Sequence, residues 1–182
     1  MNQPESLLDP LDQFYFVSGV AVPKATKIEA ERIPEPYRSL LVHDNDMTPT
    51  LEAEYRQRIH IRLISREVED DVLRRQVLLV LDSDERPVEF GAIRIQLNQL
   101  PPEARQRVLE SGLPLGRVLQ DFFIQHNSQP VAYFEVEADS RIGEALKISG
   151  AQRLYGRRNR LLTPSGEVLA EVVEILPPSR SE

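Results

Sequence analysis

The amino-acid sequence predicts an α+β fold, in which helices cover one side of a mostly antiparallel six-stranded sheet. Two observations lead to this prediction. Several segments alternate apolar and polar residues and are separated by short turn sequences, which is typical of paired strands. Other segments open with proline and repeat apolar residues at intervals of three and four, which is typical of short helices packed on a sheet.

The N-terminal part of the chain is the hardest to place. Residues 1–35 mix acids and prolines, and we treat them as an extension of uncertain structure ahead of a single domain at 36–178. Within this extension, the apolar segment 14–22 is either an added strand or a segment packed over the core. The residues alone do not decide between the two.

Two short helices are expected next. Tyr37, Leu40 and Leu41 fall at helical spacing. After a polar loop, Thr48 and Pro49 indicate the start of a second helix, with Thr48 as the N-cap and the proline at the first helical position.

The remaining elements follow from alternation and from turn residues. The acidic segment 67–71 is interpreted as a solvated loop, and 163–166 as a tight turn. The expected elements are a strand at 59–63, a hairpin of strands at 72–81 and 88–97, helices that open at Pro101 and Pro114, a strand at 132–138, and a second hairpin of strands at 157–162 and 168–176.

Arg75 is the most informative residue of the predicted sheet. Side chains alternate along a strand, so Arg75 shares a face with Val77, Leu79 and Leu81. A guanidinium stays protonated and is rarely buried without an anionic partner. We therefore expect either an ion pair with a carboxylate of the chain or a bound anion.

Two glutamates of the last strand could supply that carboxylate. Glu174 shares a face with Ala170 and Val172, whereas Glu171 faces the other way, so periodicity alone leaves open which acid is inside. A glutamate on an apolar face beside an arginine is either one half of a static ion pair or an acid–base group near a substrate.

Helix starts supply a second kind of anion-binding group. The predicted helices begin beside Met47 and Leu115, where main-chain N–H groups without helical partners favour a carboxylate or a phosphate. Gly116 lies in the first turn of the second of these helices, where a glycine allows the main chain to approach a ligand closely.

Other candidate sites carry less weight. The segment 43–46, His-Asp-Asn-Asp, matches no common metal motif and is interpreted as turn and capping residues. His60 and His126 have no recognisable partners for a nucleophilic site, and no glycine-rich phosphate loop follows a strand. Phosphotransfer and acyl-enzyme chemistry are therefore not expected.

Composition narrows the function classes further. Without cysteine the chain can have no disulfide, thiolate metal site or cysteine nucleophile. A formal net charge of −7 argues against a broad nucleic-acid-binding surface. No apolar run reaches membrane-spanning length and the N-terminus does not look like a secretory leader, so we expect a cytoplasmic protein without membrane insertion.

Five segments in order resemble the chorismate pyruvate-lyase family over about residues 37–177. Each segment is short, and the order of the whole set carries the resemblance. It implies a lyase that converts chorismate to 4-hydroxybenzoate and pyruvate in a pocket enclosed beneath helical segments, with no metal or organic cofactor. The segments are LVHDNDMT at 41–48, RQVLL at 75–79, LPLGR at 113–117, LYGRRNR at 154–160 and EILP at 174–177.

The resemblance also implies four substrate-binding residues, Met47, Arg75, Leu115 and Glu174, of which Arg75 and Glu174 are catalytic. Under this hypothesis, main-chain N–H groups at Met47 and Leu115 hold the ring carboxylate of chorismate. Arg75 stabilises the charge that develops on the ether side, and Glu174 assists proton movement during elimination.

The chain departs from the family pattern in two places. Better-known members have glutamate where this chain has Gln76, and Gly-Arg-Thr where it has residues 91–93, Gly-Ala-Ile. The second departure removes a positive charge, for which Arg94 could stand in. Because of these differences the product could also be 3-hydroxybenzoate. The alternative function is a non-catalytic ligand-binding or sensor domain for a small aromatic carboxylate on the same fold.

Overall fold

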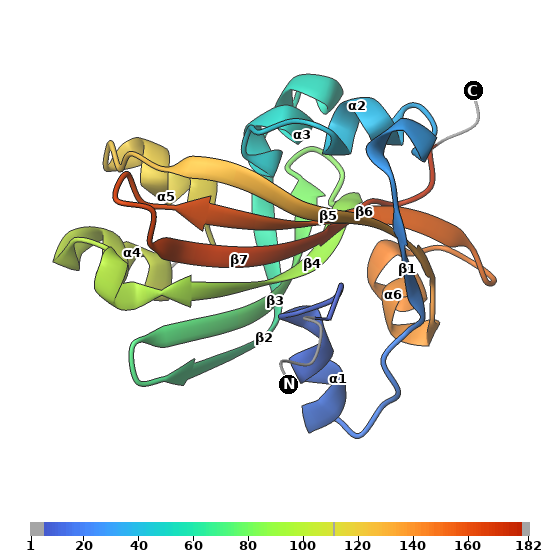
Figure 1. The fold of residues 1–182 in the computed structure, drawn as a ribbon, viewed down its shortest axis with the longest axis horizontal. Coiled ribbons are helices and arrows are strands. Elements are labelled where there is room, and N and C mark those ends of the chain that lie inside the picture. Colours follow the sequence, from blue (N-terminus) through green and yellow to red (C-terminus); the bar gives the residue numbers. More distant parts are fainter. Residues whose placement is uncertain (1–5, 111, 180–182) are drawn as a thin grey trace.

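The computed structural model describes residues 6–110 and 112–179. They form the predicted α+β fold, built on one antiparallel sheet (Figure 1). The sheet has seven strands rather than six, in the order β1-β5-β6-β7-β4-β3-β2. The elements are α1 (Leu11–Val17), β1 (Ala25–Ile28), α2 (Tyr37–Leu41), α3 (Met47–Tyr55), β2 (Ile59–Glu69), β3 (Val72–Leu81), β4 (Pro87–Gln96), α4 (Pro102–Glu110), α5 (Leu115–Asp121), β5 (Asn127–Glu137), α6 (Ser140–Leu146), β6 (Arg153–Leu162) and β7 (Val168–Ile175), with short 3-10 turns at Ala30–Arg32 and Leu97–Gln99.

Two three-stranded units meet at the centre of the sheet. Strands β2, β3 and β4 form one unit and β5, β6 and β7 the other, and β4 pairs with β7 where they join. This junction places Gly91 directly opposite Glu174. A Cβ atom on Gly91 would lie 2.0 Å from the main-chain oxygen of Val173, so the two strands can approach this closely only because Gly91 has no side chain.

Helices cover both faces of the sheet, whereas the sequence predicted only one covered face. Leu78 and Val80 of β3 belong to a core cluster that also contains residues of α1 and α6. Val77 and Leu79 point the other way and pack in a cluster with α2 and α3. Helices α4 and α5 share a third cluster with Leu73, farther along that second face (Figure 1).

The additional elements come from segments whose sequence signals are short. Segment 14–22 is not a strand: it contributes to α1, where Leu11 and Tyr15 are buried and pack over the core. Helix α6, which was not predicted, begins where the Asp139 side chain accepts a hydrogen bond from the Ile142 N–H at 2.9 Å. Strand β1, from the same N-terminal region, pairs with β5 at one edge of the sheet.

The edge strand β2 extends farther than the sequence predicted. Residues 67–69, which were predicted to lie in a loop, pair with β3 as part of the strand. Only Asp70 and Asp71 form the turn into β3. Asp70 has a positive φ of 52°, a conformation that aspartate tolerates in tight turns. No helix in the described ranges is long and apolar enough to cross a membrane.

Candidate functional site

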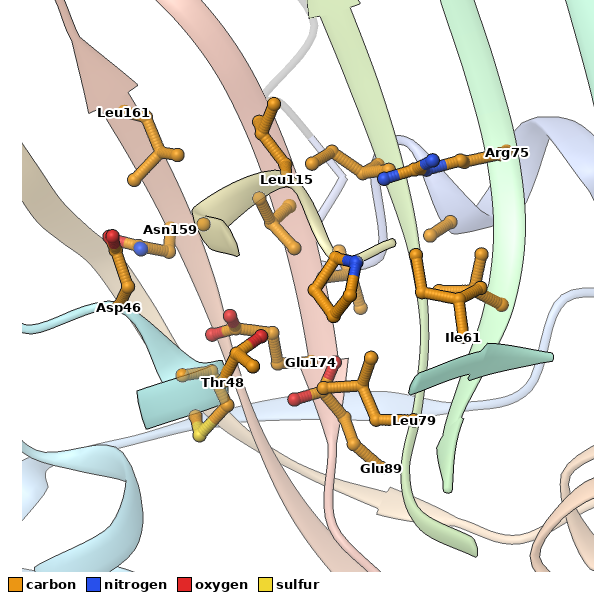
Figure 2. A pocket seen from close by; sticks show the side chains of 18 residues that line it. Asp46, Thr48, Ile61, Arg75, Leu79, Glu89, Leu115, Asn159, Leu161 and Glu174 are labelled. Atoms are coloured by element: carbon orange, nitrogen blue, oxygen red, sulfur yellow. The ribbon is translucent and has the colours of Figure 1, made fainter. Parts of the chain in front are cut away.

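A cavity of about 70 Å³ lies on the sheet face that α2 to α5 cover, at the centre of the fold (Figure 2). Strands β3, β4, β6 and β7 form its floor, and the first turns of α3 and α5 form part of its wall. This volume holds several water molecules. Its lining residues include Asp46, Met47, Thr48, Arg75, Glu89, Leu115, Gly116, Asn159 and Glu174.

The four residues implied by the family resemblance all line this cavity, although they come from four different elements. Met47 and Leu115 are the first residues of α3 and α5, while Arg75 lies in β3 and Glu174 in β7. Each of the four is no more than 5% exposed. The structure therefore brings together the residues that the sequence singled out, and their roles in binding or catalysis stay predictions.

The start of α3 differs by two residues from the predicted start. Asp46, with extended backbone, occupies the N-cap position, so Thr48 is the second helical residue and Pro49 the third. The first main-chain N–H groups of any helix have no partner within the helix. Met47 and Thr48 bring such groups to the cavity wall, and both residues are buried.

Arg75 reaches inward from β3 over the cavity (Figure 2). Its Nη2 donates a hydrogen bond to the main-chain oxygen of Leu113 at 3.2 Å, while its buried Nε has no partner. Within the described part of the chain, no carboxylate lies at ion-pair distance from Arg75. Of the two expected alternatives, the ion pair with Glu174 or Glu171 is therefore absent, because both acids pair with other arginines. Burial, together with the nearby charge of Arg66, lowers the pKa of Arg75 to about 10. The guanidinium therefore remains charged at neutral pH.

Glu174 is instead held by Arg157, a fully buried residue of the neighbouring strand β6. The Arg157 Nε donates to a Glu174 carboxylate oxygen. Its two Nη groups donate to the main-chain oxygens of Leu41, His43 and Asn45, at 3.2, 2.9 and 3.1 Å. Arg157 thus fixes Glu174 in place and ties the loop before α3 to the sheet.

Glu171 lies on the opposite face of the sheet, which settles the alternative that periodicity left open. Its carboxylate accepts hydrogen bonds from Arg94, Arg158 and Arg160. Burial alone would raise its pKa, but these guanidinium partners lower it below its usual range. Arg94, bonded also to Asp9, faces away from the cavity and does not replace the positive charge missing from the family pattern.

Glu89 is a cavity residue that the sequence interpretation missed. It lies in β4 on the same face as Arg75, and it is 4% exposed. Burial, and next the charge of Glu174, raise its pKa well above its ordinary value, although Arg157 opposes the shift. The only sequence signal was an acid on the apolar face of a predicted strand, the same signal that marked Arg75.

The acidic loop before α3 forms a polar contact rather than a metal site. The Asp46 Oδ2 lies 2.7 Å from the His126 Nε2, so Asp46 pairs with a histidine instead of capping the helix with its side chain. Over residues 6–110 and 112–179, no three His, Asp or Glu side chains gather in a way that could hold a metal ion.

Comparison with known proteins identifies the fold. No protein-family model matches the chain, and no curated protein matches its sequence. Among solved structures, PhnF from Mycobacterium smegmatis superposes with a TM-score of 0.57 at 10% identity, over 94% of this chain and 95% of that one. The effector domain of the same protein gives 0.56 at 12% identity, over 74% of this chain and 90% of that domain.

A third structure has a lower similarity. YydK from Bacillus subtilis, described as a possible transcriptional regulator, gives a TM-score of 0.51 at 6% identity, over 66% of this chain and 59% of that one. At such identities the likeness shows a common fold. The chain therefore shares its fold with the effector domain of PhnF.

Proposed function

We propose that this protein binds a small cyclic carboxylate in the cavity between the sheet and the first turns of α3 and α5. The observation that carries this proposal is Arg75, a buried cation with an unpartnered Nε and with no carboxylate of residues 6–110 or 112–179 at ion-pair distance. An arginine guanidinium matches the planar geometry of a carboxylate. The ligand's carboxylate would accept the hydrogen bond for which the Arg75 Nε has no partner among the described residues.

The rest of the lining indicates what the carboxylate is attached to. Apolar side chains, among them Ile61, Val77, Leu79 and Leu161, surround the space beside the guanidinium. A ring of carbon atoms fits such a wall better than an extended polar chain. Main-chain N–H groups at Met47 and Leu115 remain the proposed second contact for the ligand's carboxylate.

Binding can be tested by calorimetric titration with benzoate and 4-hydroxybenzoate. Benzyl alcohol serves as a neutral ligand of similar shape, and benzylamine as a cationic one. We expect the two carboxylates to bind and the neutral and cationic ligands to bind much more weakly. Equal affinity for all four compounds would contradict a carboxylate site.

A second candidate function is chorismate pyruvate-lyase, and one specific observation favours it. The four residues that the family resemblance implied, Met47, Arg75, Leu115 and Glu174, line a single cavity. In this reaction the ether C–O bond of chorismate breaks and the ring carbon that bears the hydroxyl loses its proton. The ring becomes aromatic, and the departing enolpyruvate takes up a proton to become pyruvate.

The geometry suggests how the chain would assist this elimination. Glu174, held by Arg157, can accept the ring proton. Arg75 can stabilise the negative charge on the departing enolpyruvate, because a guanidinium in a poorly solvated pocket interacts strongly with an anion. The driving force is the aromaticity of the product, so the enzyme's task is positioning.

Incubation with chorismate separates the two candidates. Pyruvate release can be followed by a coupled lactate dehydrogenase assay, with chromatography to distinguish 4-hydroxybenzoate from 3-hydroxybenzoate. Catalytic release that disappears in Arg75→Met and in Glu174→Gln would establish the lyase. Stoichiometric binding of chorismate without pyruvate would leave the binding function and exclude the lyase.

A further inference from the structure

Glu89 and Arg75 lie toward opposite ends of the cavity floor. In the pairing of β3 with β4, Arg75 is opposite Ile93 and Glu89 is opposite Leu79, so the two positions are four residues apart along the strands. Four residues of strand correspond to about 13 Å. Figure 2 shows Glu89 and Glu174 on the same side of the cavity, away from Arg75. A ring whose carboxylate meets Arg75 would extend along the cavity floor toward Glu89.

One oxygen of the Glu89 carboxyl group lacks a hydrogen-bond partner among the residues that the structure describes. This atom, Oε2, is buried. The charge of Arg157 acts on Glu89, but the N–H groups of Arg157 donate to Glu174 and to main-chain oxygens of the loop before α3. Leaving a buried polar atom unpaired destabilises the fold, so its retention at a cavity wall points to a partner from outside.

The charge balance determines the form of this carboxyl group. Glu174 already forms the ion pair with Arg157, so a second carboxylate beside it would be buried without a cation of its own. Burial and the negative charge of Glu174 both disfavour ionisation of Glu89 and raise its pKa. A neutral carboxylic acid carries an O–H group and can donate a hydrogen bond, which a carboxylate cannot.

We propose that Glu89 is a neutral carboxylic acid that donates a hydrogen bond to an uncharged oxygen on the ligand ring, and so selects hydroxylated cyclic carboxylates over unsubstituted ones. This inference rests on the proposed binding function and deepens it. A second anionic group at that end of the ligand is disfavoured, because it would face the ionised Glu174. The preferred ligand carries one carboxylate for Arg75 and one neutral oxygen, such as a hydroxyl, for Glu89.

The test compares ligands of equal size that differ in one oxygen atom. Wild-type protein, Glu89→Gln and Glu89→Leu are titrated calorimetrically with 4-hydroxybenzoate and 4-methylbenzoate, and with the corresponding 3-substituted pair. We expect wild type to prefer the hydroxyl member of at least one pair, by roughly three- to tenfold. Glu89→Gln, which keeps a neutral donor, should retain the preference, and Glu89→Leu should lose it.

Protonation is measured independently of any ligand. Carbon-13 NMR of protein labelled at the glutamate side-chain carboxyl reports ionisation, and the spectrum of Glu89→Gln identifies the resonance. We expect the Glu89 resonance at neutral pH to be that of a protonated acid. An ionised Glu89 would overturn the inference, as would a hydroxyl preference that survives in Glu89→Leu.

Failure of the inference can be told apart from failure of the proposed function. If wild type binds benzoates through Arg75 but shows no hydroxyl preference, the binding function stands and the role of Glu89 is wrong. If wild type binds none of the four benzoates, the proposed function fails and the role of Glu89 fails with it. Thermal melting of both variants shows that they are folded before either result is interpreted.

Discussion

Replacing Arg75 by methionine should stabilise the protein while removing its ligand-binding group. The pKa of Arg75 is lowered to about 10, two to three pKa units below its ordinary value, because the charged group is buried. Each pKa unit corresponds to about 1.4 kcal/mol, so holding this charge in the folded state costs about 3 kcal/mol at neutral pH. Methionine also loses the hydrogen bond to the Leu113 carbonyl, worth about 1 kcal/mol. The net expectation is a gain of about 2 kcal/mol.

This stability gain is measured by urea denaturation and by thermal melting without ligand. A gain of about 2 kcal/mol should raise the Tm by roughly 4 to 8 °C in a chain of this size. Arg62→Met is the matched control, because Arg62 is half-exposed and forms a surface ion pair with Glu85. Loss of this ion pair in Arg62→Met should destabilise the protein by at most about 1 kcal/mol. An Arg75→Met variant no more stable than wild type would refute the argument that Arg75 is an unpaired buried charge.

Three further predictions concern other parts of the site and the sheet. Gly91→Ala should destabilise the fold by about 3 kcal/mol or prevent folding, since its methyl group would lie 2.0 Å from a main-chain oxygen of β7; an unchanged urea midpoint would count against this. The hydrogen bond from His126 to Asp46 raises the histidine pKa against the opposing effect of burial. It should therefore contribute less than about 1 kcal/mol of stability, present below pH 6.5 and lost as the pH rises through the raised value. Asp46→Ala should lower the His126 pKa seen by proton NMR. Because Glu89 has a raised pKa in the folded state, Glu89→Gln should match wild type in stability below pH 4.5 and become progressively more stable above it, by up to about 1.4 kcal/mol per pH unit; parallel stability curves would disprove the shift.

The strands could be predicted because their sequence signals are strong and local. Alternation in β3 placed Arg75 on the face of Val77 and Leu79, and the structure has it there. The same reasoning could not choose between Glu171 and Glu174. That choice depends on the pairing of β4 with β7, which joins residues far apart in the chain.

The helices that the sequence did not predict are short or contain residue types that favour strands. Phe14, Phe16 and Val17 are residue types that favour strands, yet they lie in α1, where burial of Leu11 and Tyr15 at helical spacing outweighs that preference. Helix α6 has two turns, and its only clear sequence signal is the capping residue Asp139.

The ion-pair partners of the cavity residues also could not be predicted from the sequence. Arg75 and Glu174 are the obvious opposite charges, but Arg157, directly opposite Glu174 on β6, pairs with it instead. Which charged residues pair depends on the register between neighbouring strands, and the alternation of residues within one strand does not reveal that register. Among the described residues, this pairing leaves Arg75 without a carboxylate partner in the proposed binding site.

The most direct test of the central claim is calorimetric binding of 4-hydroxybenzoate to wild type and to Arg75→Met. We predict that wild type binds and that Arg75→Met, although more stable, binds at least about thirtyfold more weakly, because a charge-assisted hydrogen bond contributes about 2 kcal/mol or more. Equal affinity of the two proteins would contradict the claim that Arg75 receives the ligand's carboxylate.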